Sequence, residues 1–364
     1  MKIFHNYILY GTVLLCHAGV HAEHTQKTIY LGLEEYRGQY TQIMFPPANI
    51  DLFAQAAERL GYKVVEFLIP NVDSDETHAV IFFGFPQAAD NFKQRYPREK
   101  LIACIAEPPT ASPYEFDENY RAGFGKILTW DDALIDYKKY HKYTYTCDLS
   151  LRLPPVPFAQ KKFCCIVAGY LCSPHPCELY SERFKTIDFF ERHAPEDLDT
   201  YGRKWWQQVG ENYKTYRGRV EDKLGALQQY KFCICYENTK NMQGYITEKI
   251  HHCLLASCIP VYWGAPNIEK YIPANCFIAR ERFATNQEMY DFLKNMPEAE
   301  YQTYIDNIAR YLESTQALLC SPLYFAECLC RAVIPEYDRR KAFDPEQIKK
   351  LETIDMVKRI FRLP

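Results

Sequence analysis

The stretch from Tyr230 to Ile278 reads YKFCICYENTKNMQGYITEKIHHCLLASCIPVYWGAPNIEKYIPANCFI. It begins with a short apolar run, Phe232 to Tyr236, which is bounded by polar residues and is typical of a buried parallel strand. After a polar loop, apolar residues recur at helical spacing between Ile250 and Leu255. A second apolar run, Cys258 to Trp263, indicates the next strand. The stretch therefore predicts a strand, a polar loop, a helix and a strand.

Ionisable residues stand where the predicted loop meets the helix. Gly244 or Thr247 could cap this helix, and Glu248 suits its first turn. A helix N-terminus presents free N–H groups and a partial positive charge, so it favours a phosphate group. Lys249 adds a full positive charge there. This junction is therefore a candidate anion site.

The rest of the chain repeats the alternation of strands and helices on both sides of a proline-rich segment, 151–162. Such alternation predicts parallel sheets covered by helices, hence an α/β fold with two halves. We expect an N-terminal α/β domain at 23–155, a C-terminal α/β domain at 156–320 and a helical tail at 321–364. In open parallel sheets ligands bind beyond the carboxyl ends of the strands, so the cleft between the halves is the expected site.

Both ends of the chain have patterns of their own. Residues 1–22 combine Lys2, an apolar run and a small-residue cleavage pattern, and they predict a signal peptide or signal-anchor. In the tail, residues 343–364, an apolar stripe is flanked by Lys and Arg. That stripe fits either an amphipathic helix on an anionic membrane or a last helix packed on the domain. The net charge of −3 gives no global basic field, so no nucleic-acid partner is expected.

Many of the 15 cysteines lie in apolar, strand-like runs and are expected to be small buried hydrophobic residues. No C-x-x-C pair occurs, so the spacing gives little support for zinc. In the C-x-C pairs Cys233/Cys235 and Cys328/Cys330, strand alternation would place both thiols on one face. For an exported chain, disulfides remain open among the following six residues: Cys147, Cys172, Cys177, Cys320, Cys328 and Cys330.

Six residues are candidates for chemistry. Lys249 and Arg183 could together hold a diphosphate, because Arg offers a bidentate fork and Lys a point charge. Glu248 could accept the hydroxyls of a ribose, and Asn238 and Tyr245 could complete a nucleotide pocket.

The sixth candidate, Glu107, precedes two prolines in the other half and could act as a general base toward a hydroxyl. The four ionisable candidates also have ordinary alternatives: Glu248 and Lys249 as a solvated helix start, Arg183 as a surface residue and Glu107 as a loop acid.

The same stretch resembles the donor-binding motif of the α-1,3/1,4-fucosyltransferase family. The matching residues are Tyr236-Glu237-Asn238, Tyr245-Ile246-Thr247-Glu248-Lys249, Ile259-Pro260-Val261-Tyr262-Trp263-Gly264, Pro273 and Phe277-Ile278. Weaker matches are Ala106-Glu107-Pro108, Tyr180-Ser181-Glu182-Arg183 and Asp199-Thr200-Tyr201-Gly202-Arg203. The likeness covers roughly Leu101 to Phe283.

This resemblance implies a GT-B architecture, two Rossmann-like domains facing a central cleft, with GDP-fucose held by the C-terminal half. It also implies an inverting α-1,3-fucosyltransferase that moves L-fucose to a hydroxyl of an N-acetylglucosamine- or glucose-containing glycan. Glu107 would then be catalytic, and Arg183, Asn238, Tyr245, Glu248 and Lys249 would bind the donor. No metal or cofactor is expected to be required, although Mn²⁺ or Mg²⁺ could stimulate the reaction.

One departure from the family pattern concerns the acceptor side. The Ser that usually follows the acidic segment is replaced by Pro109, so the acceptor is less certain than the donor. Two alternatives stay open: a transferase that uses another GDP-sugar, and an inactive glycan-binding relative. We expect membrane association through the N-terminal segment or the basic tail, in a Golgi-type lumen in a eukaryote or at the cytoplasmic face of the inner membrane in a bacterium.

Overall fold

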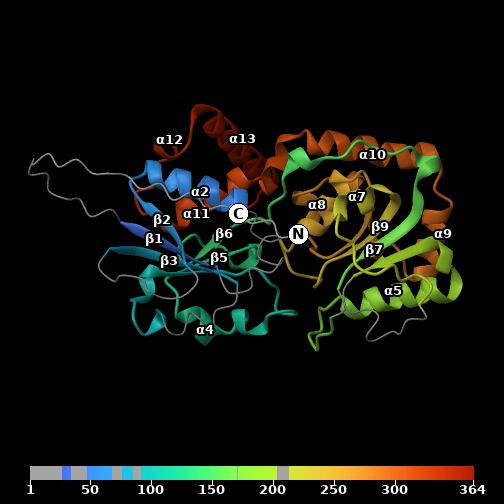
Figure 1. The fold of residues 1–364 in the computed structure, drawn as a ribbon, viewed down its shortest axis with the longest axis horizontal. Coiled ribbons are helices and arrows are strands. Elements are labelled where there is room, and N and C mark those ends of the chain that lie inside the picture. The colour runs from blue at the N-terminus through green and yellow to red at the C-terminus, as the bar shows by residue number, and fades with distance from the viewer. Residues whose placement is uncertain (1–26, 34–46, 68–75, 85–91, 170, 203–212) are drawn as a thin grey trace, which may run out of the picture.

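The computed structural model describes residues 27–33, 47–67, 76–84, 92–169, 171–202 and 213–364. Figure 1 shows two α/β halves side by side, with the first sheet on the left and the second on the right. The predicted α/β class with two parallel sheets is confirmed. The predicted signal segment, 1–22, lies outside the described residues.

The N-terminal half is built on a six-stranded sheet in the order β2-β1-β3-β4-β5-β6, in which every pairing is parallel. Its strands are β1 (Thr28–Leu33), β2 (Lys63–Phe67), β3 (Thr77–Phe83), β4 (Leu101–Cys104), β5 (Lys126–Thr129) and β6 (Tyr140–Lys142). Alternation along β3 gives the sheet two apolar faces: Ala79, Ile81 and Phe83 enter one core cluster, whereas Val80 and Phe82 enter the other.

The two faces of this sheet are covered by helices from distant parts of the chain. Helix α4 (Glu118–Ala122) lies on one side, and α2 (Pro47–Arg59) lies on the other together with α11 (Pro322–Val333), α12 (Arg339–Ala342) and α13 (Pro345–Phe361) (Figure 1). Helix α11 packs against α2 and also contacts β5 and β6. The chain after residue 321 therefore returns to the N-terminal half.

The C-terminal half has a five-stranded parallel sheet in the order β11-β10-β9-β7-β8. Its strands are β7 (Lys162–Val167), β8 (Leu198–Tyr201), β9 (Tyr230–Tyr236), β10 (Ile259–Trp263) and β11 (Ile278–Ala279). Its helices are α5 (Tyr180–His193), α7 (Lys223–Gln228), α8 (Glu248–Leu255), α9 (Asn286–Lys294) and α10 (Glu298–Leu312). The strand–loop–helix–strand unit predicted from Tyr230 to Trp263 is present as β9, α8 and β10.

Thr247, and not Gly244, caps helix α8. The Thr247 side chain accepts from the backbone N–H of Lys249, whereas Gly244 has a φ of +81° and belongs to the preceding loop. The proline-rich segment contains neither a strand nor an α-helix over residues 151–161, as expected of a connection, and β7 begins at its last residue, Lys162. The segment is nevertheless tied to the C-terminal half, because the Leu153 N–H donates to the Leu255 carbonyl at 2.9 Å.

The tail helix α13 supports the packed alternative for its apolar stripe. Leu351, Ile354 and Val357 are buried, and only the last member, Ile360, is strongly exposed, at 66%. Within the described ranges, no helix has both the length and the apolar character that crossing a membrane requires.

The cysteines match the expectation of small buried residues in all but two cases. Of the described thiols only Cys172 is exposed and Cys177 half-buried, and all are free. Strand alternation does not apply to Cys328 and Cys330, because both lie in helix α11.

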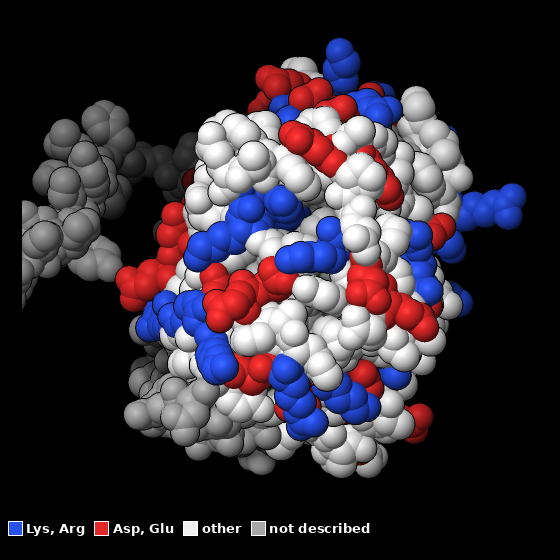
Figure 2. Space-filling view, turned by 90° about the vertical axis from the view of Figure 1, so that its right-hand side faces the viewer, with Lys and Arg blue, Asp and Glu red and all other residues white. Residues whose placement is uncertain are grey.

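On the outer face of the C-terminal half, Lys and Arg are interspersed with Asp and Glu (Figure 2).

Candidate active site

All six residues singled out from the sequence line one cavity of about 210 Å³ between the two halves. They are Glu107, Arg183, Asn238, Tyr245, Glu248 and Lys249. Glu107 follows β4 of the first sheet, and Asn238 follows β9 of the second, so the cavity lies beyond the carboxyl ends of strands from both sheets. A cavity is therefore present where the sequence analysis expects the candidate site.

Glu107 contributes a carboxylate from the N-terminal half. Its Oε2 lies 3.5 Å from the Asn238 amide nitrogen of the other half. Burial raises the pKa of Glu107 above its ordinary value, while the Lys249 ammonium opposes this shift. A carboxylate with a raised pKa is a stronger proton acceptor, which suits a general base.

A second carboxyl, Glu115, is buried in the loop that follows Glu107. It is 2% exposed and accepts a hydrogen bond of 2.9 Å from the Ser112 hydroxyl. Burial raises its pKa to about 8. Glu115 is therefore protonated at neutral pH in the folded protein.

Lys249 is held by an acid that the sequence analysis quoted but did not assign. Glu237 is fully buried, and its Oε2 lies 3.2 Å from the Lys249 ammonium. Its other carboxylate oxygen accepts from the Thr247 N–H at 2.8 Å, and the Thr247 hydroxyl lies 2.8 Å from Oε2. Burial would lower the pKa of Lys249, but Glu237 and Glu248 outweigh it and raise that pKa. Lys249 is therefore a fixed cation at the start of α8.

Glu248 remains ionised beside this cation. Burial acts to raise its pKa, but Lys249 and Lys223 outweigh it and hold the pKa at about 2. The Lys223 ammonium lies 3.8 Å from the Glu248 carboxylate and also lines the cavity. A permanently charged acceptor of this kind can receive hydrogen bonds from a diol.

Arg183 organises the loop after β9 from helix α5. It is 3% exposed, and its Nη2 donates to the Tyr236 carbonyl at 2.6 Å and to the Asn238 side-chain oxygen at 3.0 Å. These contacts orient Asn238 so that its amide nitrogen faces Glu107. Arg183 thus brings positive charge to the cavity wall and links the two halves of the site through Asn238.

Tyr245 marks the junction between the halves. Its ring lies 4.6 Å from the Trp130 ring and 6.0 Å from the Tyr145 ring, both of the N-terminal half. The preceding Gly244 is confined, since a Cβ there would meet the Trp130 carbonyl oxygen at 2.3 Å. Only glycine fits this positive-φ position against the other half.

The pair Asp131-Asp132 has a structural part in the same junction. Asp132 forms an ion pair of 2.7 Å with Lys142, and it accepts from Asn267 at 2.7 Å and from the Tyr271 hydroxyl at 2.8 Å. Across the part of the chain that the structure describes, no group of three or more His, Cys, Asp or Glu side chains is arranged to hold a metal ion.

Sequence reasoning missed Glu237, Lys223 and Tyr145 as parts of this site. Glu237 lies inside the quoted Tyr-Glu-Asn motif, so the motif itself could have indicated it. Lys223 opens the short helix α7 just before β9, outside the matched motif, and Tyr145 follows β6, which was not predicted because it has only three residues. No local signal connects Lys223 or Tyr145 with the donor loop.

Solved structures with the same arrangement of two sheets define the class of the fold. The crystal structure of an alpha1,3-fucosyltransferase with GDP is similar over 88% of this chain and 94% of that one, with a TM-score of 0.52 and 18% identity. The structure of Anabaena Alr3699/HepE in complex with UDP is similar over 84% of this chain and 98% of that one, with a TM-score of 0.53 and 10% identity. The fold is that of the GT-B glycosyltransferases, as expected.

Sequence comparison places the chain more closely. The family model "Glycosyltransferase family 10 (fucosyltransferase) C-term" matches residues 160–344, so the chain belongs to this family. It is 27% identical over 240 residues to 4-galactosyl-N-acetylglucosaminide 3-alpha-L-fucosyltransferase 9 of Rattus norvegicus, which covers 62% of this chain and 60% of the relative. It is 36% identical over 87 residues to Alpha-(1,3)-fucosyltransferase FucT of Helicobacter pylori, which covers 24% and 18% of the two chains. The chain thus matches about 60% of the length of the first of these relatives.

Proposed function

We propose that the protein is an inverting glycosyltransferase that moves L-fucose from GDP-fucose to a hydroxyl of an N-acetylglucosamine- or glucose-containing glycan, with α-1,3 linkage. One observation carries the proposal: a carboxylate from one half faces a fixed cation and a buried arginine from the other across a single cavity. Membership of glycosyltransferase family 10 supports the choice of fucose, and the likeness to the crystal structure of an alpha1,3-fucosyltransferase with GDP-fucose supports the choice of GDP.

The proposed donor site lies in the C-terminal half. Lys249, at the N-terminus of α8, and Arg183 would hold the diphosphate and stabilise the negative charge that develops as GDP leaves. Glu248, ionised at neutral pH, would accept the ribose hydroxyls. Asn238 and Tyr245 would contact the nucleotide sugar.

The proposed transfer is a single displacement. The acceptor oxygen attacks C1 of fucose, its proton passes to the Glu107 carboxylate, and the bond between C1 and the phosphate oxygen breaks with its electron pair leaving on GDP. The sugar passes through an oxocarbenium-like state, as in other glycosyl transfers. Because the attack and the departure occur on opposite faces, the configuration at C1 inverts. All charge stabilisation in this scheme comes from side chains, so we propose that no metal is required.

The test is transfer from GDP-fucose to N-acetyllactosamine and related acceptors, with the product linkage read by NMR. We expect a new α-1,3-linked fucose, and Glu107→Gln protein as a matched control should bind GDP and form none. Thermal stabilisation by UDP but not by GDP would reject the donor. An unchanged rate in the Glu107→Gln protein would reject the base.

Membrane association remains part of the proposal only through the N-terminal segment. The apolar stripe of α13 is largely used in packing against the body of the protein. We expect a protein that lacks residues 1–22 to stay in the soluble fraction of a cell lysate, while the full chain sediments with membranes. Sedimentation of both forms alike would contradict this assignment.

A further inference from the structure

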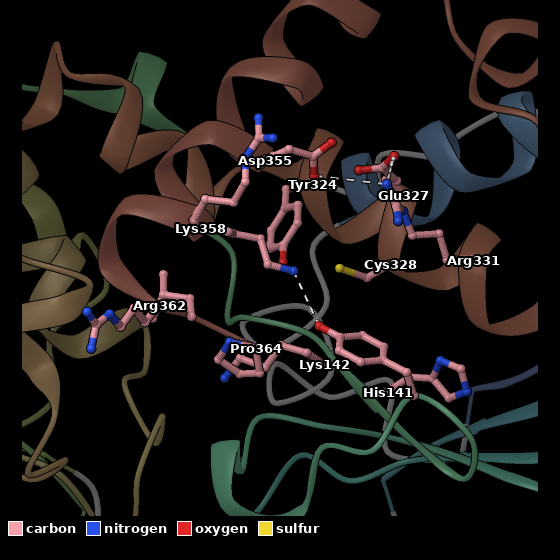
Figure 3. A pocket seen from close by; sticks show the side chains of 13 residues that line it. His141, Lys142, Tyr324, Glu327, Cys328, Arg331, Asp355, Lys358, Arg362 and Pro364 are labelled. Atoms are coloured by element: carbon pink, nitrogen blue, oxygen red, sulfur yellow. Dashed lines mark hydrogen bonds and ion pairs between the residues drawn. The ribbon is translucent and has the colours of Figure 1, made fainter.

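A second cavity, larger than the donor cleft, lies on the other side of the interdomain junction. Its volume is about 640 Å³, within the range of about 300–1,000 Å³ typical of small-molecule sites. Residues from the end of the first sheet form its floor, and helices α11 and α13 with the residues that follow form its roof (Figure 3). None of its lining residues lines the donor cleft. We call it the tail pocket.

The charge of the tail pocket is positive. Five Lys and Arg side chains line it, against two acids, Glu327 and Asp355. Both acids already have cationic partners. Arg339, outside the pocket lining, pairs with Glu327 and with Asp355, and Arg331 lies 3.1 Å from Glu327. Lys142 is likewise taken by Asp132.

Three cations remain without an acidic partner. Within the described residues, Lys358, Arg359 and Arg362 form no ion pair with any carboxylate. Figure 3 shows Lys358 reaching into the space between the roof and the floor, with Arg362 on the side opposite Arg331. Burial lowers the pKa of Lys358 and the nearby Arg331 adds to this, whereas Cys328, Asp355 and Glu327 act in the opposite direction. An anion beside Lys358 would give this ammonium the direct ionic partner that it lacks among the described residues.

Two aromatic rings flank this cation. The Lys358 ammonium lies 5.7 Å from the ring centroids of Tyr137 and of Tyr324, and 3.3 Å from the Tyr137 hydroxyl. The rings come from opposite walls, Tyr324 from α11 and Tyr137 from the loop before β6. Tyr324 is buried, whereas Tyr137 is 51% exposed. A single oxyanion would leave most of the cavity unfilled, whereas a sugar ring could lie against the exposed ring of Tyr137.

We propose that the tail pocket binds a phosphorylated or sulfated sugar of monosaccharide size, with the oxyanion on Lys358 and the ring against Tyr137. The site does not depend on the proposed transfer reaction. It takes an anionic saccharide separately from the donor nucleotide.

The test is isothermal titration of the full chain with glucose 6-phosphate and N-acetylglucosamine 6-sulfate, and with glucose and inorganic phosphate as controls. We expect saturable binding of at least one anionic sugar, about tenfold or more tighter than either control, and weaker at high ionic strength. Binding of neither anionic sugar would overturn the proposal. Inorganic phosphate binding as tightly as the sugars would also overturn it, because the Tyr137 ring would then contribute nothing.

Variants locate the ligand. Lys358→Met keeps most of the length of the side chain without its charge and should weaken binding by about tenfold or more. Lys350→Met, on the same helix but in an exposed pair with Glu346, is the matched control and should bind like the parent. An equal loss in the control, or no loss in the Lys358→Met protein, would place the ligand elsewhere. GDP affinity, measured in parallel, should be unchanged in both proteins, so failure here is distinguishable from failure of the donor site.

Discussion

The pair of Glu237 and Lys249 allows the structural and the chemical parts played by Lys249 to be separated. Replacing Lys249 by Met leaves the fully buried Glu237 carboxylate without its cation. Breaking a buried ion pair from one side costs about 3–5 kcal/mol. The Lys249 side chain is 21% exposed, and Thr247 still donates to Glu237 in the variant. We therefore expect Lys249→Met to lower the free energy of unfolding by about 3 kcal/mol. Glu237→Gln should cost about 2 kcal/mol, because the stranded ammonium can reach water.

The double variant carries the decisive result. With both charges removed the remaining cost should be about 2 kcal/mol, so the two changes should couple by about 3 kcal/mol. Lys249→Met should also abolish measurable GDP binding and transfer, and the double variant should regain stability without regaining either. The repaired protein would then fold but lack the cation that holds the diphosphate.

Stability is measured by urea unfolding at constant protein concentration, GDP affinity by calorimetry, and transfer with the acceptor used above. Lys350→Met is the control for loss of an exposed pair and should cost about 0.5 kcal/mol or less. A coupling near zero would refute the buried pair as a unit. Recovery of GDP affinity in the double variant would refute the assignment of Lys249 to the diphosphate.

Three further predictions rest on other residues of the site. The raised pKa of Glu107 should shift the acid limb of the rate–pH profile for kcat/KM above the ordinary carboxyl range, since the base must be ionised; a limb near 4.5 would contradict this. Glu115, protonated when folded, should make stability fall as pH rises from about 4.5 to about 8, because its folded pKa exceeds its unfolded one; melting curves of Glu115→Gln should lack that contribution, and identical slopes would reject it. Gly244→Ala should lower the melting temperature by several degrees, because its methyl group meets the Trp130 carbonyl oxygen. An unchanged melting temperature would contradict the close approach of the two halves at Gly244.

The sequence was sufficient to predict the part of the candidate site that lies in the C-terminal half, because its signals are local. Phe232 to Tyr236 and Cys258 to Trp263 each carry a continuous apolar run, and the helix between them has an identifiable capping residue. These features lie within some 50 residues, and the chain alone sets the order of strand, loop and helix. The same order fixes which end of the parallel strands carries Asn238 and Lys249.

Short elements, and segments that return to a distant part of the fold, were harder to predict from the sequence. The three-residue strand β6 carries no periodicity to detect, and the apolar run of α11 does not reveal that it will pack on α2, more than 260 positions earlier in the chain. Helix α11 packs there because the first sheet has two apolar faces, and helices must cover both of them. The tail pocket is a consequence of this return, so nothing in the local sequence indicated it.

The sequence by itself determined the two α/β halves, the helix tip with its cation, and the six polar residues to examine. Only the tertiary structure decided that Glu107 faces Asn238, that Glu237 is the partner of Lys249, and that Asp132 joins the halves instead of serving a ligand. The physical reason is that strand and helix signals depend on neighbours along the chain. Burial, ion pairing and pKa depend on groups that meet only when distant segments pack together.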